Sequence, residues 1–161
     1  MEGLLVREPI SYAGYDLGLV QKYVFPEGRL VVQGGSGHVD QSHDLAQGTL
    51  KNFYTEGARK DDLFGKDEFT GPFIALSDEE LNSQFQMEPC YRTQLCGLRL
   101  IEQKLPNSGG LWSFSHIGFS SDHRQALVYY RNVFWEETGV GLLEKGAEGW
   151  SIVATAALSV S

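Results

Sequence analysis

Cysteine, basic residues and long hydrophobic runs are all scarce in this chain of 161 residues. Its cysteines, Cys90 and Cys96, are too few for a secreted scaffold held by disulfides, and their spacing fits neither a zinc motif nor a redox pair. The 13 Lys and Arg residues stand against 21 Asp and Glu, which gives a net charge of −8. This charge argues against binding to nucleic acid and against electrostatic docking on an anionic membrane. No apolar run approaches the roughly 18 residues that span a bilayer, so the sequence predicts neither a nucleic-acid nor a membrane partner.

Apolar residues are plentiful enough for one folded core. Hydrophobic residues make up 42% and aromatic residues 12% of the chain, which is too much for intrinsic disorder. We predict a single domain over residues 1–161, with an irregular helical half over about 1–105 and a β-meander over about 111–161. Residues 1–9 lack a basic segment followed by an apolar one, which predicts a cytoplasmic protein; export is the alternative if a leader has been removed.

The last third of the chain has the pattern of consecutive strands. Four runs that alternate or are rich in β-branched and aromatic residues are joined by polar or glycine-containing turns: 111–119, 125–135, 140–145 and 150–161. In the last run, Trp150, Ile152 and Ala154 fall on one predicted inner face. The segment 136–139 is expected to break the sheet between two of these runs. The predicted fold class is therefore α+β, with helices packed on one face of a curved antiparallel meander of four or more strands.

The first two thirds of the chain combine helical and extended patterns. Apolar residues at steps of three and four predict helices over about 15–25, 49–56 and 90–105, and short apolar runs predict strands over 29–33 and 72–76. After the second strand, Ser77 and Glu80 have the spacing of a capping box, in which the serine caps a helix and the glutamate reaches back.

Several motifs of the meander match a shared pattern: Ser115–Phe119, Gln125–Tyr130, Leu142–Lys145 and Gly149–Trp150. In these motifs the chain resembles a group of uncharacterised bacterial proteins with a C-terminal antiparallel meander. The resemblance implies the meander and no established activity, so it places no catalytic residue in this chain. Helices on a curved meander are also similar, by analogy of architecture, to the cystatin-like and nuclear-transport-factor-2-like folds.

One polar cluster contains residue types that bind metals. His38, Asp40, His43 and Asp44 supply imidazoles and carboxylates, which suit zinc, iron or manganese. Their spacing matches no established metal motif, and glycines at 34–37 precede them. We therefore expect a solvated surface loop with no bound metal, and the sequence indicates no other cofactor.

A second polar cluster surrounds the first turn of the meander. His116, Asp122 and His123, with Ser115 nearby, are the candidate catalytic residues, because a hairpin can bring a strand histidine close to an acid. No Gly-x-Ser-x-Gly motif accompanies the serine. The alternative is that His116 is one polar residue on an aromatic face and that the other two are ordinary turn residues.

The run 125–135 is apolar on both of its faces and must be covered on both. Its aromatic residues Tyr129, Tyr130, Phe134 and Trp135 are the candidate ligand or interface residues. We therefore predict a non-enzymatic binding or self-association domain: a homodimer, or a domain that binds a small molecule or a protein.

The alternative function is a small hydrolase or isomerase with its pocket between the helices and the concave face of the sheet. Its polar groups would come from His116, Tyr129, Tyr130 and Arg131.

Overall fold

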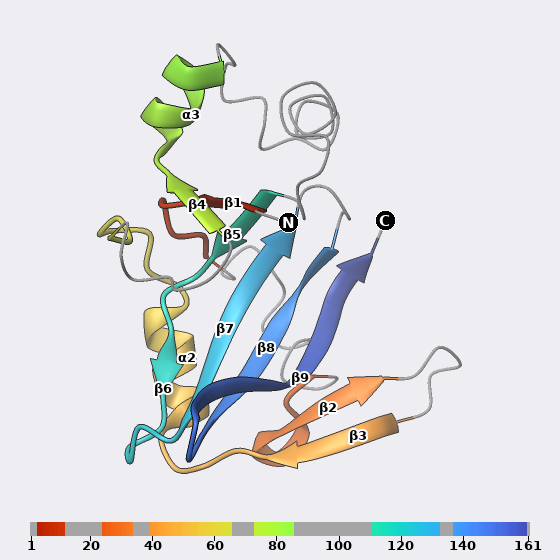
Figure 1. Ribbon diagram of the computed structural model, residues 1–161. Helices are drawn as coiled ribbons and strands as arrows, with labels where there is room; N and C mark the ends of the chain where they lie inside the picture. Colours follow the sequence, from red (N-terminus) through yellow and green to blue (C-terminus); the bar gives the residue numbers. More distant parts are fainter. Residues whose placement is uncertain are drawn as a thin grey trace.

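The computed structural model describes residues 3–11, 24–33, 39–65, 73–85, 111–132 and 137–160. Within them the chain forms a mixed sheet of seven strands, a separate two-stranded hairpin and two α-helices (Figure 1). The elements are β1 (Gly3–Val6), a 3₁₀ turn η2 (Pro26–Gly28), β2 (Arg29–Gln33), β3 (Val39–Asp44), α2 (Thr49–Glu56), β4 (Phe73–Leu76), α3 (Asp78–Phe85), β5 (Leu111–Phe114), β6 (Gly118–Phe119), β7 (Gln125–Asn132), β8 (Glu137–Gly146) and β9 (Gly149–Val160). Neither helix of this described part is long and apolar enough to cross a membrane.

The strands of the last third pair in sequence order. β5 pairs with β7, β7 with β8 and β8 with β9, each antiparallel, and the short β6 also pairs with β7. The first predicted strand is divided into β5 and β6, because at Ser115 the chain bonds to Tyr129 through both its backbone N–H and its side-chain hydroxyl. The predicted break at 136–139 is wrong from Glu137 onward, since these residues already belong to β8.

The sheet extends beyond the predicted antiparallel meander and is mixed. β1 lies between β4 and β5 and is parallel to both, which gives the strand order β4-β1-β5-β7-β8-β9. Its four residues are apolar without alternation, a pattern typical of a short central strand that is buried on both sides. Leu5 and Val6 are accordingly 0% and 3% exposed.

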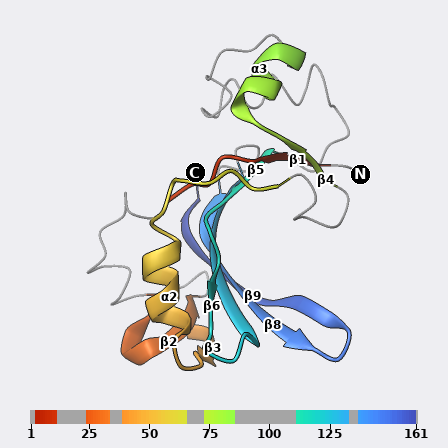
Figure 2. The same cartoon turned by 90° about the vertical axis from the view of Figure 1, so that its left-hand side faces the viewer.

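One face of the curved sheet, here called the core face, forms the main hydrophobic core. It carries Leu127, Tyr129, Val140, Leu142, Ala154 and Ala156. The helix α2 and the β2–β3 hairpin lie on this side of the sheet (Figure 2). Phe53 of α2 is fully buried, and its ring lies 5.8 Å from that of Phe25. The helix α3 instead follows β4 at the far end of the sheet, so among the described helices only α2 covers the core face.

Most local predictions for the first half are confirmed where the structure describes them. The strand at 29–33, the helix at 49–56 and the strand β4 form as expected. The capping box also forms, since the Glu80 N–H donates to Ser77 Oγ at 3.1 Å and the Ser77 N–H donates to Glu80 Oε1 at 3.4 Å. The predicted helix at 90–105 and all but the end of the one at 15–25 lie outside the described residues.

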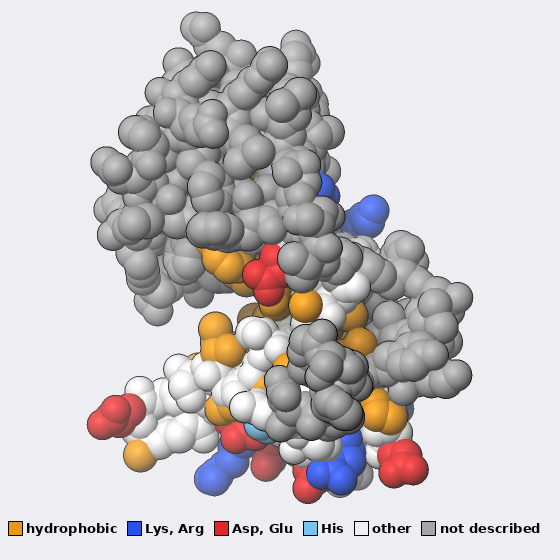
Figure 3. All heavy atoms as spheres, turned by 90° about the vertical axis from the view of Figure 1, so that its right-hand side faces the viewer, with side chains coloured by type: hydrophobic (Ala, Val, Ile, Leu, Met, Phe, Trp, Pro, Cys, Tyr) orange, Lys and Arg blue, Asp and Glu red, His pale blue; other side chains and the backbone are white. Residues whose placement is uncertain are grey.

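The β8–β9 hairpin has a bulge that changes which side chains face the core. Leu142 pairs with Ala154, but Leu143 pairs with Ile152, so β9 contains one extra residue at this point. Ile152 therefore lies on the face opposite to Ala154 and is 68% exposed, which corrects its predicted inward orientation. Figure 3 views the molecule from the right-hand side of Figure 1, where hydrophobic side chains of the described part lie exposed among charged ones.

Candidate functional site

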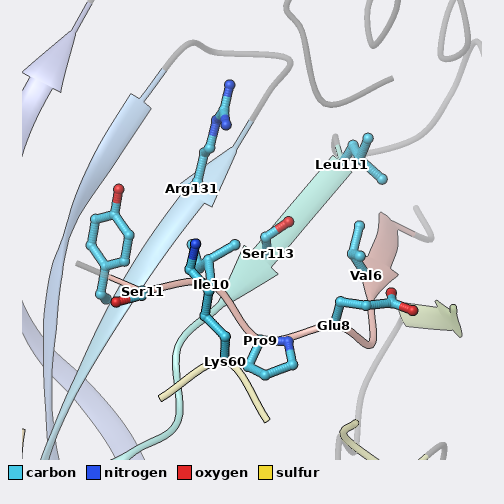
Figure 4. Close-up of a pocket in the computed structure, with 10 residues that line it drawn as sticks. Val6, Glu8, Pro9, Ile10, Ser11, Lys60, Leu111, Ser113 and Arg131 are labelled. Atoms are coloured by element: carbon cyan, nitrogen blue, oxygen red, sulfur yellow. The ribbon is translucent and has the colours of Figure 1, made fainter. Parts of the chain in front are cut away.

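A pocket of about 250 Å³ lies at the end of the core face where β1, β5 and β7 meet. The strands contribute Val6, Leu111, Ser113, Tyr129 and Arg131, all on the core face by their pairing register. The segment after β1 contributes Glu8, Pro9, Ile10 and Ser11, and the segment after α2 contributes Lys60 (Figure 4). The pocket is therefore built from four parts of the chain that are far apart in sequence.

The wall formed by residues 8–11 is fixed on both sides by hydrogen bonds. The Arg7 N–H donates to Leu76 O at 2.9 Å, the Phe64 N–H donates to Arg7 O at 2.9 Å, and the Ile10 N–H donates to Phe114 O at 3.0 Å. The Arg7 side chain also donates from Nε to Phe64 O at 2.6 Å and forms an ion pair of 3.3 Å with Glu80. The pocket is thus largely preformed, as binding sites for small molecules usually are.

The acidic residue of the pocket is engaged by a neighbouring helix. Both carboxylate oxygens of Glu8 accept the backbone N–H of Asp78, at 2.9 Å each, at the start of α3. Figure 4 shows this carboxylate turned away from Lys60 and Arg131. Burial raises the pKa of Glu8 above its ordinary value, against the opposing effect of the Asp78 N–H. The cationic residues of the pocket lining are Lys60 and Arg131.

The structure brings together two of the four polar residues predicted to line a pocket. Tyr129 and Arg131 line it, whereas Tyr130 lies on the opposite face and donates from its hydroxyl to Glu137 Oε1 at 2.7 Å. Burial, followed by this bond to Glu137, raises the pKa of Tyr130. Tyr129 and Tyr130 are each only 6% exposed within a single chain, so neither needs a second subunit to cover it. Phe134 and Trp135 lie outside the described residues, and self-association stays a prediction.

His116 lies outside the pocket lining. Its Nε2–H donates to the backbone O of Asp61 at 2.6 Å, and its ring lies 5.1 Å from that of Phe64. Both contacts come from the segment that follows α2. The described contacts of His116 therefore hold that segment against the sheet and include neither Asp122 nor a pocket residue.

Asp122 and His123 form contacts typical of a tight turn. Asp122 Oδ1 accepts from Ser120 Oγ at 2.7 Å and from the Arg124 N–H at 3.1 Å, and the Ser120 bond is the main cause of the lowered pKa of Asp122. His123 has a positive φ of 56° and stacks on Phe119 at 5.2 Å. These contacts organise the backbone of the turn, and none of them involves His116.

The predicted metal cluster falls partly within strand β3 and not in a loop. Asp44 forms an ion pair of 3.0 Å with Arg29, and His43 Nε2–H donates to Gln41 Oε1 at 3.2 Å. Because His43 and Asp44 are neighbours in a strand, their side chains point to opposite faces. His38 and the side chain of Asp40 lie outside the description. The described residues contain no group of three or more His, Cys, Asp or Glu side chains that could hold a metal ion.

Sequence reasoning missed Glu8 and Lys60 in the pocket, and it missed the structural importance of Gln125. The glutamine is 6% exposed; its Oε1 accepts from the Ala46 N–H at 2.7 Å and from Thr49 Oγ1 at 2.9 Å, and its Nε2 donates to Asp44 O at 3.0 Å. A polar residue at the start of an otherwise apolar strand face was the available signal for it. No comparable signal marked Lys60, which the path of the chain after α2 brings to the pocket.

No protein-family model, curated protein or solved structure matches the chain. The resemblance to a group of bacterial proteins with a similar meander therefore stays a prediction. The function has to be inferred from the geometry of the pocket.

Proposed function

We propose that this protein binds a small molecule in the pocket on the core face of its sheet. The observation that carries the proposal is the fixed wall at residues 8–11, which closes a space of about 250 Å³ over Ser113 and Tyr129. Apolar and polar side chains both line this pocket, and in small-molecule sites such polar groups fix the orientation of the ligand. This volume lies just below the roughly 300–1,000 Å³ typical of ligand pockets, so the ligand is small.

The proposal retains binding, which is the first function expected from the sequence. Of the four aromatic residues expected at a ligand or interface site, Tyr129 lines this pocket, whereas Tyr130 lies on the opposite face of the strand. The enzyme alternative placed His116 in such a pocket, and the bonds of His116 to the segment after α2 give that alternative no support. We also propose that several helices cover one face of the meander, as expected from the sequence.

The test is a screen of small neutral, cationic and anionic molecules by two-dimensional NMR of the ¹⁵N-labelled protein. We expect bound molecules to shift the amide signals of residues 6–11, 111–113 and 129–131. The variant Ser113→Phe places a large ring in the pocket and is expected to abolish these shifts, whereas Ser42→Phe, at an exposed position of β3, is expected to leave them unchanged.

The folding of both variants is checked by thermal unfolding. If Ser113→Phe fails to fold, the smaller Ser113→Leu replaces it. The proposal is wrong if no molecule shifts these signals, or if the shifts persist in a folded variant whose pocket is filled.

A further inference from the structure

Exposed hydrophobic residues of the described chain gather at the start of strand β9. Trp150, Ile152 and Val153 are 40%, 68% and 37% exposed, and Leu63, in the segment after α2, is the one other large hydrophobic residue among those described that is exposed to a comparable degree. The turn end of the β8–β9 hairpin extends away from α2 (Figure 2). Single exposed apolar residues are ordinary on a protein surface, but a cluster of them marks an interaction site.

This cluster lies at an edge of the sheet. β9 is the last strand in the strand order and, among the described strands, pairs with β8 alone. Its twelve residues include no charged residue and no proline, which natural edge strands use to prevent pairing with other chains. The backbone groups on the outer side of an edge strand can bond to a further strand. A strand therefore fits this surface better than a small molecule.

Charge and symmetry favour a second copy of this chain as the source of that strand. The protein carries a net charge of −8, so two copies repel each other least where they meet on an uncharged strand. Two copies of one strand can pair antiparallel about a two-fold axis, which brings the same residues of both copies together. An axis close to Ile152, the most exposed residue of the cluster, joins the hydrophobic residues of both copies in one contact.

The bulge in β9 limits the extent of this contact. The extra residue between Ile152 and Ala154 interrupts the edge, so pairing is confined to a short segment around residues 150–153. A contact about a two-fold axis is also complete once two copies have met. The expected assembly is therefore a weak dimer and not an open-ended chain of molecules.

We infer that two copies of this chain associate through the edge of β9 at residues 150–153, antiparallel about a two-fold axis close to Ile152. This surface shares no residue with the pocket, so the inference is independent of the proposed binding function.

The experiment measures the mass of the full chain by sedimentation velocity at protein concentrations from about 10 µM to about 1 mM. We expect a reversible monomer–dimer equilibrium. Ile152→Lys and Ile152→Glu should each raise the dissociation constant at least about tenfold, because each removes apolar contact and places like charges opposite each other at the axis. Hydrogen exchange of the backbone amides of residues 150–153 should become slower as the parent protein dimerises.

Mixing the two charged variants provides the sharpest test of where the axis lies. If Ile152 faces its own copy, Ile152→Lys and Ile152→Glu together should form a mixed dimer, because opposite charges then meet at the axis. The matched controls are Leu63→Lys and Leu63→Glu, at an exposed hydrophobic position outside β9, and each should leave the dissociation constant within about twofold of the parent value. The folding of all variants is checked by thermal unfolding, and Ile152→Ser replaces a charged variant that fails to fold.

The inference is wrong if the parent protein stays a monomer over the whole concentration range, or if it forms larger assemblies that grow with concentration. It is also wrong if folded Ile152 variants dimerise as tightly as the parent, or if the Leu63 variants weaken the dimer as much as they do. A dimer weakened at Ile152 whose two charged variants do not associate on mixing would contradict the position of the axis.

Discussion

Replacing Gln125 with methionine is expected to destabilise the protein strongly, although the change preserves side-chain size. Gln125 joins the first residue of β7 to the end of β3 and to the start of α2. Methionine fills a similar volume but offers no hydrogen bond of comparable strength. The substitution therefore isolates the polar contribution of this side chain.

The magnitude follows from the four groups that lose their partner, of which the carboxylate of the exposed Glu144, at 3.3 Å from Gln125 Nε2, simply returns to water. The Thr49 hydroxyl is fully buried, and leaving such a group unpaired costs about 1–3 kcal/mol. Ala46 and Asp44 are exposed residues whose backbone groups can regain water, so each lost bond there costs about 0.5–1.5 kcal/mol. We expect a total loss of about 2–6 kcal/mol, a large part of the roughly 5–15 kcal/mol that stabilises a typical domain.

The assay is urea denaturation followed by tryptophan fluorescence and circular dichroism, with Gln47→Met as control. Gln47 is an exposed residue of the same loop, and its replacement is expected to change the free energy of unfolding by no more than about 0.5 kcal/mol. Thr49→Val should cost less in the Gln125→Met background than alone, because the hydroxyl has then already lost its acceptor. A loss of less than about 1 kcal/mol for Gln125→Met, or strict additivity with Thr49→Val, would refute this account.

Three further predictions concern helix packing and pH. Gly118→Ala is expected to lower the free energy of unfolding by about 1–3 kcal/mol or more, because a Cβ there overlaps the backbone of Asn52 and Phe53 in α2. The control is Gly146→Ala, where a Cβ meets nothing closer than 4.0 Å, and it should be nearly neutral in the same assay. The lowered pKa of Asp122 means that its carboxylate stabilises the fold above its ordinary value of 3.8 and loses this effect as the pH falls through the folded pKa. Denaturation across the acid range should therefore show Asp122→Asn less stable than the parent near neutrality and equal to it at the lowest pH, and a constant difference would contradict the assignment. The effect of pH on the contribution of Glu8 to stability has the opposite sign. Because its pKa is raised, protonated Glu8 stabilises the fold below pH 4.5, and this stabilisation is lost as the pH rises through the folded pKa. The variant Glu8→Gln, which cannot ionise, should therefore lose less stability than the parent as the pH rises through that value.

The local structure of this protein is largely determined by its sequence. The helix at 49–56 forms because Phe53 and its apolar neighbours recur at helical spacing, and the capping box of Ser77 and Glu80 forms because it needs only residues three positions apart. The pairing of β7 with β8 follows from two apolar runs joined by a short segment. Each of these features depends on interactions between residues that are close in sequence.

Tertiary structure decided the partners of β1, the orientation of Ile152 and the composition of the pocket. β1 is a four-residue apolar run with no local pairing signal, and it becomes a strand by inserting between β4 and β5. The bulge in β9 changes the face on which Ile152 lies, and only the pairing register with β8 reveals it. Lys60 and Arg131 come to one pocket because the chain after α2 returns to the sheet, a long-range contact that no periodicity in the sequence encodes.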